Sequence, residues 1–372
     1  MKILTVCIPT YKRHATLQRC IDSIVEQIEK YNLADSVDIY VADDASPDET
    51  AEVLAQYSHL QYFVGVTREK NLGMNVNIKV MLMTLAERSH YQLIVTDDDY
   101  LQPNVLDDIV QFLVKQNSSA KHVPVIWTPR YSYTEDDKLH DITCVSFPDS
   151  AYIEASASNV GRYIDGAFVL SGLIIRAESI DFGFWDEYSD NAYFPVIFSG
   201  DLLLKGGAYY WNKSIAYHTV LNLCHWERWG TTDVMIHIRQ VADFNNAYYV
   251  LAGRIEKTSD RLAFYIAARH SIESEMTALL LSEDLAAHRP VAIEALYKLR
   301  EQGVLRFPWP IKMLAIYGFL ASTSKVFLKC LVFGIARLLP QSEEKKESHR
   351  KKFSFYKKVL ANAGVAGLVA MS

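Results

Sequence analysis

Short apolar runs and segments with helical periodicity alternate along the first third of the chain. Residues 2–8 and 37–42 are almost entirely apolar, and between them apolar side chains recur every three or four positions. The first pattern is typical of a buried strand, and the second is typical of a helix that packs on one face. The alternation then continues. We predict further strands at 60–64, 91–95 and 122–127, and further helices at 73–88 and 103–115.

This order of elements predicts an α/β fold with a mainly parallel sheet and helices on both faces. In such sheets, ligands bind outside the carboxyl ends of the strands. Polar clusters follow three of the predicted strands, at residues 9–13, 43–50 and 97–99. We therefore expect these clusters to lie together at one edge of the sheet.

Three consecutive aspartates, Asp97, Asp98 and Asp99, follow the apolar run at 91–95. Bunched carboxylates repel one another unless a cation or hydrogen-bond donors compensate them, and hard oxygen ligands favour Mg²⁺ or Mn²⁺. A solvated loop that caps the helix starting near Pro103 is the alternative interpretation. The polar clusters upstream favour the metal site.

Four segments, taken in order, resemble the signature of family-2 glycosyltransferases with the GT-A, Rossmann-like fold. They are residues 6–13 (VCIPTYKR), 41–48 (VADDASPD), 71–77 (NLGMNVN) and 96–99 (TDDD). One such motif alone is weak, but four in the right order, each on a predicted ligand loop, make a specific pattern. The resemblance covers about the first third of the chain, and the remainder is less similar.

The resemblance implies that the loops bind a nucleotide-sugar donor. Thr10 and Tyr11 are available to the base and ribose, and Asp44 can accept a hydrogen bond from the base. Arg68 and Lys70 precede the third motif and suit a diphosphate, although they can also be surface charges beside a turn. The residues assigned to donor binding are Pro9, Thr10, Tyr11, Arg13, Asp43, Asp44, Arg68, Asn71, Gly73, Asn77 and Asp97.

The aspartate run resembles the metal-binding DxD motif of the family in two registers, Asp97 with Asp99 or Asp98 with Asp99. We assign Asp98 and Asp99 to a Mg²⁺ or Mn²⁺ ion that, in the family, bridges the donor phosphates and stabilises the leaving group. His218 follows Gly206 and Gly207 at a spacing similar to that of relatives in which a histidine completes the metal site. A structural histidine is the alternative.

Asp190 is our candidate for the base that takes the proton of the acceptor hydroxyl, the role of a carboxylate in inverting enzymes. It lies in a segment that resembles the acceptor side of the family, and we predict that it opens a helix running to about Lys205. A helix N-cap is the alternative role. The rival acidic residues are Asp186, Glu187 and Asp201.

The segment at 225–229 (HWERW) is similar to the Gln-x-x-Arg-Trp motif of polysaccharide synthases in the same family. Arg228 and Trp229 match it and are assigned to the acceptor or diphosphate, since an arginine suits a diphosphate and an indole stacks on a sugar. His225 departs from the motif. That departure, and the lack of the multiple membrane spans of those synthases, argue against processive polymerisation.

Composition limits the partners and the compartment. A net charge of −6 disfavours nucleic acid as a partner. The five cysteines show no disulfide or metal-ligand spacing, which favours a reducing cytoplasm. Residues 1–4 lead directly into the first predicted strand, so we expect no cleavable signal peptide.

We predict a glycosyltransferase domain at 1–240, with a nucleotide-sugar half at 1–128 and an acceptor half at 129–240, followed by a helical region at 241–372. Residues 311–339 are apolar but interrupted by cationic side chains, and the tail at 345–358 is basic. This pattern is too short for a membrane span and suits an interfacial helix pair beside anionic lipids. Packing on the catalytic domain or on a second subunit is the alternative, which leaves homo-oligomerisation open.

Together these features predict a metal-dependent, inverting glycosyltransferase that moves one sugar from a nucleotide donor to a glycan. We expect a lipid-linked oligosaccharide acceptor at the inner face of a bacterial plasma membrane, for lipopolysaccharide O-antigen or capsule. Within the family, the chain looks most like O-antigen sugar transferases of the abequosyltransferase type. Two alternatives are a noncatalytic membrane-associated scaffold, which the intact aspartate run opposes, and a nucleotidyltransferase, which would require a glycine-rich loop after the first strand.

Overall fold

The computed structural model describes residues 1–119, 122–129, 131–133, 139–142, 149–164, 170–188, 190–219, 234–268 and 354. The chain divides into two compact units. The first unit contains residues 1–190 and 194–229, and the second contains residues 191–193 and 230–372. All the predicted donor and metal residues belong to the first unit.

The first unit begins with the predicted alternation of strands and helices, which the structure confirms. The elements in order are β1 (Lys2–Thr10), α1 (His14–Tyr31), β2 (Val37–Asp43), α2 (Thr50–Tyr57), β3 (Phe63–Thr67), α3 (Met74–Leu85), β4 (Ser89–Ile94), β5 (Tyr100–Leu101) and α4 (Leu106–Asn117). The strand predicted at 60–64 lies three residues later, because Leu60 closes a turn with its amide on the Tyr57 carbonyl and pairing with β2 starts only at Phe63.

The rest of the first unit adds strands to this sheet and to a second one, together with further helices. They are β6 (Val125–Trp127), β7 (Tyr131–Tyr133), β8 (Leu139–Ile142), β9 (Ala151–Ile153), α5 (Ala157–Tyr163), β10 (Leu173–Arg176), η2 (Ala177–Ser179), α6 (Phe182–Trp185), η3 (Asp186–Tyr188), α7 (Phe194–Gly206), β11 (Ala208–Tyr210) and β12 (Ala216–Thr219). The strand predicted from 122 begins at Val125. These elements carry the acceptor-side candidates.

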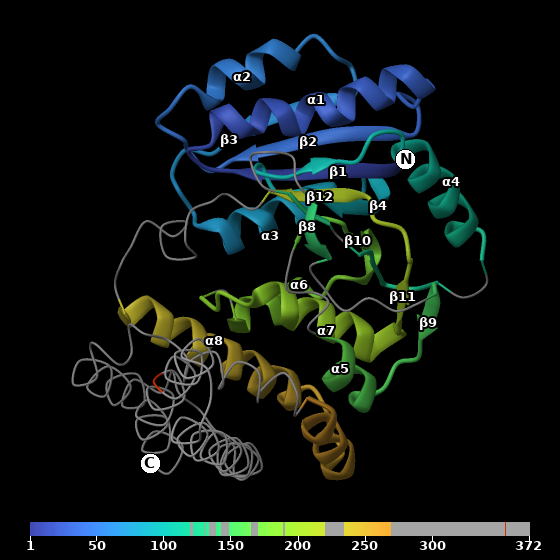
Figure 1. The fold of residues 1–372 in the computed structure, drawn as a ribbon, viewed down its shortest axis with the longest axis vertical. Helices are drawn as coiled ribbons and strands as arrows, with labels where there is room; N and C mark the ends of the chain where they lie inside the picture. The colour runs from blue at the N-terminus through green and yellow to red at the C-terminus, as the bar shows by residue number, and fades with distance from the viewer. Residues whose placement is uncertain are drawn as a thin grey trace, which may run out of the picture. The chain divides into compact units, whose positions relative to one another are not determined.

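The main sheet has eight strands in the order β3-β2-β1-β4-β10-β6-β11-β9. Strands β3, β2, β1 and β4 pair in parallel, whereas β10 is antiparallel to both β4 and β6. The predicted mainly parallel α/β fold is therefore confirmed, with an antiparallel strand inserted in the middle of the sheet. Figure 1 shows α1 and α2 over one face of this sheet and α3 against the other.

Both faces of β1 are buried, which explains its unbroken apolar sequence. Leu4, Val6 and Ile8 join one core with α1, α2 and α4, and Cys7, whose side chain alternates to the other face, is also fully buried. The buried residues of α1 recur at helical spacing, so this helix contributes one apolar face to that core. They are Leu17, Cys20, Ile21, Ile24, Gln27 and Ile28.

A second sheet has four strands in the order β5-β12-β7-β8, and its strand β5 directly follows the aspartate run after β4. Strand β12 pairs antiparallel with β5, with Tyr217 opposite Tyr100. This register places His218, the next residue of β12, beside Asp99, the residue before β5. The pairing of β12 with β5 thus places His218, which is distant in sequence, next to the aspartate run.

Arg176, at the end of the inner strand β10, makes several contacts with neighbouring elements. Its side chain is almost fully buried, and its Nη1 donates to the Tyr91 hydroxyl at 3.2 Å, to Asn117 Oδ1 at 3.4 Å and to His122 Nδ1 at 3.0 Å. Its Nε donates to Glu178 Oε1 at 2.6 Å. One guanidinium therefore connects β4, β10 and the end of α4.

Replacing Arg176 with methionine keeps most of the side-chain volume but leaves the buried Tyr91 hydroxyl without this donor. We expect the free energy of unfolding to fall by about 2 kcal/mol, the usual penalty for a buried polar group left unpaired. Urea unfolding measures this change. The control is Glu178→Gln, which should change stability by less than about 0.5 kcal/mol because the Glu178 side chain is exposed. Equal stability of the two variants would contradict this role.

The second unit contains α8 (Val234–Gly253) and a helical segment at 258–268. Phe244, Tyr248 and Phe264 are buried in it, with ring centroids 5.0 Å and 5.9 Å apart for the two successive pairs. No helix in the described part of the chain combines enough length with enough apolar character to cross a bilayer. The apolar segment predicted at 311–339 and, apart from residue 354, the basic tail predicted at 345–358 lie outside the described residues.

Candidate functional site

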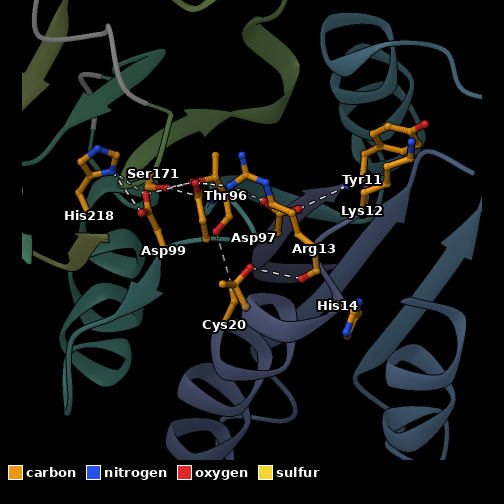
Figure 2. A network of polar contacts seen from close by, with 12 residues as sticks. Tyr11, Lys12, Arg13, His14, Cys20, Thr96, Asp97, Asp99, Ser171 and His218 are labelled. Carbon is orange, nitrogen blue, oxygen red and sulfur yellow. Dashed lines mark hydrogen bonds and ion pairs between the residues drawn. The ribbon is translucent and has the colours of Figure 1, made fainter. Parts of the chain in front are cut away.

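The polar segments predicted to form the site meet at the carboxyl ends of β1, β2 and β4. Strands β1 and β2 pair so that Thr10 lies opposite Asp43, and the Asp44 amide donates to the Thr10 carbonyl at 3.0 Å. On the other side, the Tyr11 amide donates to Asp97 Oδ2 at 3.4 Å. The structure thus brings together the first, second and fourth motifs, and Figure 2 shows the part around the aspartate run.

Asp44 holds the third motif against the second. Its Oδ1 accepts a hydrogen bond from the Leu72 amide at 2.8 Å, and its Oδ2 accepts one from the Gly73 amide at 2.9 Å. Gly73 has φ +83°, a conformation that residues with a Cβ adopt at a cost. Asn71 Oδ1 also accepts from the Gly73 amide at 2.9 Å. Both oxygens of Asp44 are therefore engaged in shaping this loop.

Asp43, unlike Asp44, has a carboxylate oxygen without a hydrogen-bond partner among the described residues. Asp43 is fully buried, and its Oδ1 accepts from the Ser46 amide at 3.0 Å. Its Oδ2 is buried without a hydrogen-bond partner among the described residues. A buried carboxylate oxygen is rarely left unpaired, because it has lost its hydration without compensation. Asp43 Oδ2 is thus an acceptor position that a bound molecule would stabilise.

Arg68 offers a donor on the neighbouring strand end. Its amide donates to the Asp43 carbonyl at 2.8 Å, and its Nε donates to Asn77 Oδ1 at 3.0 Å. Asn77 is itself fixed, since its Nδ2 donates to the Ala42 carbonyl at 2.8 Å. Arg68 Nη2 is buried without a hydrogen-bond partner among the described residues. The predicted cation is therefore oriented by Asn77, with one N–H group unsatisfied.

Arg13 supplies the positive charge nearest to the aspartate run. Its Nη1 forms a hydrogen-bonded ion pair with Asp98 Oδ2 and lies 3.8 Å from Asp97 Oδ1. Asp97 is nearly buried, and this burial raises its pKa to about 7, against the opposing effect of Arg13. The Asp98 charge raises the Asp97 pKa further. The carboxylates are thus crowded enough to need a compensating cation.

Asp99 and His218 form the other half of the cluster. The Asp99 side chain is fully buried, and His218 Nδ1 lies 3.2 Å from each of its carboxylate oxygens. The Thr96 hydroxyl donates to Asp99 Oδ2 at 3.0 Å. Figure 2 shows His218 and Thr96 on two sides of this carboxylate. Two of the residues that we assigned to a metal, Asp99 and His218, are therefore neighbours, although 119 positions separate them.

The donor set fits a hard divalent cation. Carboxylate oxygens from Asp98 and Asp99, with the imidazole of His218, suit Mg²⁺ or Mn²⁺, which commonly keep water and substrate phosphate among their ligands. Among the described residues, however, no group of three or more His, Cys, Asp or Glu side chains is placed so that it could hold a metal ion by itself. The residues therefore fit a metal that the phosphates of a donor help to hold.

The predicted start of the acceptor-side helix is wrong. Helix α7 begins at Phe194, so Asp190 lies in an exposed turn four residues earlier and is not its N-cap. Residues 191–193 form a local turn before the helix, in which Asn191 Oδ1 accepts a hydrogen bond from the Tyr193 amide at 2.7 Å. The capping alternative for Asp190 is therefore excluded, whereas its role as a base remains a prediction.

Two rivals of Asp190 are engaged in ion pairs. Asp186 Oδ1 lies 2.5 Å from Lys79 Nζ, and the buried Asp201 lies 2.7 Å from Lys205 Nζ. In each pair, a lysine ammonium group already occupies a carboxylate oxygen. Glu187 is exposed. Asp190 and Glu187 are consequently the better candidates for proton acceptance.

Asn75, which the sequence analysis did not single out, joins the acceptor-side segment to the donor-side helix. Its Oδ1 accepts from Trp185 Nε1 at 2.5 Å, and its Nδ2 donates to the Tyr188 carbonyl at 3.3 Å. Asn75 lies in the first turn of α3, directly after the loop that Asp44 holds. No local pattern identifies this contact, because 110 residues separate Asn75 from Trp185. Arg228 and Trp229 lie outside the described residues.

Carboxylates, a histidine and an arginine thus lie together at the strand ends of a mainly parallel sheet, the edge at which ligands bind in such folds. Residues 5–141 match the family model of glycosyl transferase family 2. The matched residues carry all four motifs, so the resemblance to family-2 glycosyltransferases is confirmed for this part of the chain.

Curated relatives match about a third of the chain. The glycosyltransferase GlyG of Streptococcus pneumoniae serotype 4 is 24% identical over 136 residues, which cover 37% of this chain and 42% of GlyG. GlyA of the same organism is 23% identical over 112 residues, which cover 30% of this chain and 15% of GlyA. The matches thus span less than half the length of these relatives.

A solved structure matches along nearly the whole chain. Residues 1–349 of S. aureus TarS, in complex with UDP-GlcNAc, align with a TM-score of 0.58 at 16% identity, covering 97% of this chain and 91% of that one. The same TarS segment without a named ligand gives a TM-score of 0.58 at 15% identity. At this identity, the likeness establishes the fold.

Proposed function

We propose that the protein transfers one sugar from a nucleotide-sugar donor to a glycan acceptor, in a metal-dependent reaction that inverts the anomeric carbon. The observation that carries this proposal is the cluster of Asp98, Asp99 and His218 beside Arg13, at the strand ends where the family binds its donor. The UDP-GlcNAc complex of TarS, a protein of the same fold, supports a uridine nucleotide as the first donor to test.

In this proposal, Asp98, Asp99 and His218 hold a Mg²⁺ or Mn²⁺ ion, which supplies Lewis-acid stabilisation of the nucleoside diphosphate leaving group. Arg13 balances the charge of the aspartate run and, with Arg68, faces the donor phosphates. Asp44 shapes the Leu72–Gly73 loop, which prepares the donor pocket before binding. Asp43 accepts a hydrogen bond from the nucleobase through the oxygen that lacks a partner in the protein.

On the acceptor side, Asp190 accepts the proton of the attacking hydroxyl while the bond between the sugar and the diphosphate breaks. Asn75 keeps the segment before Asp190 in a fixed position relative to α3, so the base and the donor loop move together. Arg228 and Trp229 contact the acceptor or the diphosphate. The transfer domain extends over residues 1–240 and is followed by the helical region at 241–372.

We further propose a lipid-linked oligosaccharide as the acceptor, at the inner face of a bacterial plasma membrane in O-antigen or capsule synthesis. The basic tail at 345–358 supports this location, since anionic lipids attract such segments. A single sugar addition of the abequosyltransferase type fits the compact acceptor half.

A panel of nucleotide-sugars tests the proposed function. Purified full-length protein is incubated with each UDP-, GDP-, CDP- and dTDP-sugar, with Mn²⁺ or with EDTA, and release of the nucleoside diphosphate is measured. We expect slow hydrolysis of one donor class with Mn²⁺, together with a rise in melting temperature for the same class. Neither hydrolysis nor thermal stabilisation by any donor in the panel would contradict the proposal.

Paired variants of Asp43 and Asp44 test how the nucleobase is bound. Asp43→Asn keeps the side-chain shape but presents an N–H₂ group where the base donates. We expect affinity for the matching nucleoside diphosphate to fall by about 10- to 100-fold, corresponding to a lost charged hydrogen bond of about 1–3 kcal/mol, without a change in melting temperature. Calorimetric titration measures the affinity.

Asp44→Asn is the matched variant, because it places the same change one residue away. Its side chain can no longer accept from both the Leu72 and Gly73 amides, so we expect a lower melting temperature and a loss of affinity that follows from the disturbed loop. The assignment of the base to Asp43 fails if Asp43→Asn binds like the wild type while Asp44→Asn loses affinity at unchanged stability.

A further inference from the structure

Ser171 lies directly behind the metal-binding carboxylates, although it is 75 residues away in sequence. The antiparallel register of β10 and β4 pairs Leu173 with Ile94. Continued by two residues, this register places Ser171 opposite Thr96, at the point where β4 gives way to the aspartate run. Ser171 is completely buried, so its hydroxyl has to be satisfied within the protein.

The hydroxyl of Ser171 makes two hydrogen-bond contacts with Thr96. Its Oγ accepts a hydrogen bond from the Thr96 amide at 2.9 Å and lies 2.9 Å from Thr96 Oγ1. Thr96 Oγ1 in turn lies 3.0 Å from Asp99 Oδ2 and donates to it. Figure 2 shows Ser171, Thr96, Asp99 and His218 together in one network of contacts.

The direction of each hydrogen bond follows from the chemistry of the groups. An ionised carboxylate only accepts, so the single proton of the Thr96 hydroxyl is used on Asp99. Ser171 must therefore donate its own proton to Thr96 Oγ1, while it accepts from the Thr96 amide. The Ser171 hydroxyl thus donates one hydrogen bond to Thr96 and accepts one from it. Together these two bonds fix the rotation of the Thr96 hydroxyl.

We propose that Ser171 is a positioning residue that acts through Thr96 to hold the Asp99 carboxylate in the orientation that binds the divalent cation. This inference rests on the proposed function, since it assigns Asp99 to a metal. A carboxylate anchored on one side by Thr96 presents its remaining lone pairs in a fixed direction, towards the cation site that it shares with His218. Without Ser171, the Thr96 hydroxyl is free to turn, and the orientation of Asp99 is no longer fixed.

The test measures Mn²⁺ affinity of the full-length protein in the presence of UDP, from the electron paramagnetic resonance signal of free Mn²⁺. Groups that orient metal ligands commonly change metal affinity by about 10- to 100-fold. We expect Ser171→Ala to weaken Mn²⁺ binding by about that factor. We expect Thr96→Val, which keeps the shape of threonine but removes its hydroxyl, to weaken binding at least as much.

The double variant separates a chain of contacts from two independent effects. If Ser171 acts through Thr96, adding Ser171→Ala to Thr96→Val should cause no further loss of Mn²⁺ affinity. The matched control is Thr128→Val, which removes another buried hydroxyl close by, one that donates to the Gly172 carbonyl at 3.0 Å rather than towards the aspartate run. This control should lower stability without changing Mn²⁺ affinity.

Two results would overturn the inference while leaving the proposed function in place. One is wild-type Mn²⁺ affinity in Ser171→Ala, and the other is an equal loss of affinity in Thr128→Val. If Ser171→Ala does not fold, the inference is tested with Thr96→Val. This variant removes the other hydroxyl of the same contact, at a residue that is only half-buried. Absence of Mn²⁺ binding by the wild-type protein would overturn the proposed metal site and this positioning role together.

Discussion

Replacing Asp99 with asparagine is expected to reduce sugar transfer by about 10³-fold or more. The change removes a charged ligand without changing shape, and a metal that stabilises the leaving group contributes several kcal/mol, where about 4 kcal/mol corresponds to about 10³ in rate. Stability should change little, because an asparagine oxygen can still accept from Thr96. Transfer with the donor identified in the panel, measured across Mn²⁺ concentrations, checks the result.

Asp107→Asn is a suitable control for this experiment. Asp107 is a partly exposed carboxylate in the first turn of α4, outside the aspartate run, and its loss should leave transfer unchanged. Wild-type activity that survives exhaustive EDTA treatment would remove the metal from the reaction. Comparison with Asp97→Asn and Asp98→Asn then decides which register of the DxD motif binds the cation.

The second large effect is expected for Asp190→Asn, which should reduce turnover by about 10²–10⁴-fold, the range for loss of general-base assistance. The variant keeps the shape of the side chain and removes only its basicity. Donor affinity should be unchanged, because the donor loops are elsewhere in the first unit. Since Asp190 lies in an exposed turn and does not cap α7, both Asp190→Asn and Asp190→Ala should keep wild-type stability within about 0.5 kcal/mol.

Single-turnover transfer and urea unfolding together check this prediction. Asp186→Asn is the matched control, because it changes a nearby carboxylate that is paired with Lys79. Normal turnover in Asp190→Asn, with a large loss in Glu187→Gln, would move the base to Glu187. Retention at the anomeric carbon, observed by NMR of the product, would contradict the single-displacement mechanism for any choice of base.

The first half of the fold was predictable because its signals are local. The apolar run of β1 and the helical spacing of Leu17, Ile21 and Ile24 determine which faces are buried, and their burial is observed. Parallel strands with helical connections then place their carboxyl ends at one edge. That rule alone brought Thr10, Asp43 and Asp97 into one region before any tertiary contact was known.

The details of the site were less predictable, because they depend on contacts between distant segments. The engagement of Asp44 by two loop amides follows from the course of the chain at Gly73, and nothing in the second motif distinguishes Asp43 from Asp44. The antiparallel insertion of β10 into a parallel sheet has no local signature. Ser171, which this strand places behind Thr96, could not be found without the structure.

The start of α7 shows a different limit of sequence reasoning. Asp190 is a good helix-capping residue type, and helical periodicity follows it, so a helix from this position was a reasonable prediction. In the structure, the Asn191 side chain competes for the backbone through the Tyr193 amide and delays the helix to Phe194. The hydrogen bond from the Tyr193 amide to the Asn191 side chain thus explains why α7 begins at Phe194.

Calorimetric titration of the full-length protein with UDP, in Mn²⁺ and in EDTA, tests the central claim most directly. If Asp99 and His218 hold a cation that the donor diphosphate completes, UDP should bind at least about 10-fold more tightly with Mn²⁺ than with EDTA. In Asp99→Asn, the affinity should be the same in Mn²⁺ and in EDTA. If UDP does not bind the wild-type protein, the titration uses the nucleoside diphosphate of the donor class found in the panel. Equal affinity in Mn²⁺ and EDTA for the wild-type protein would contradict the account.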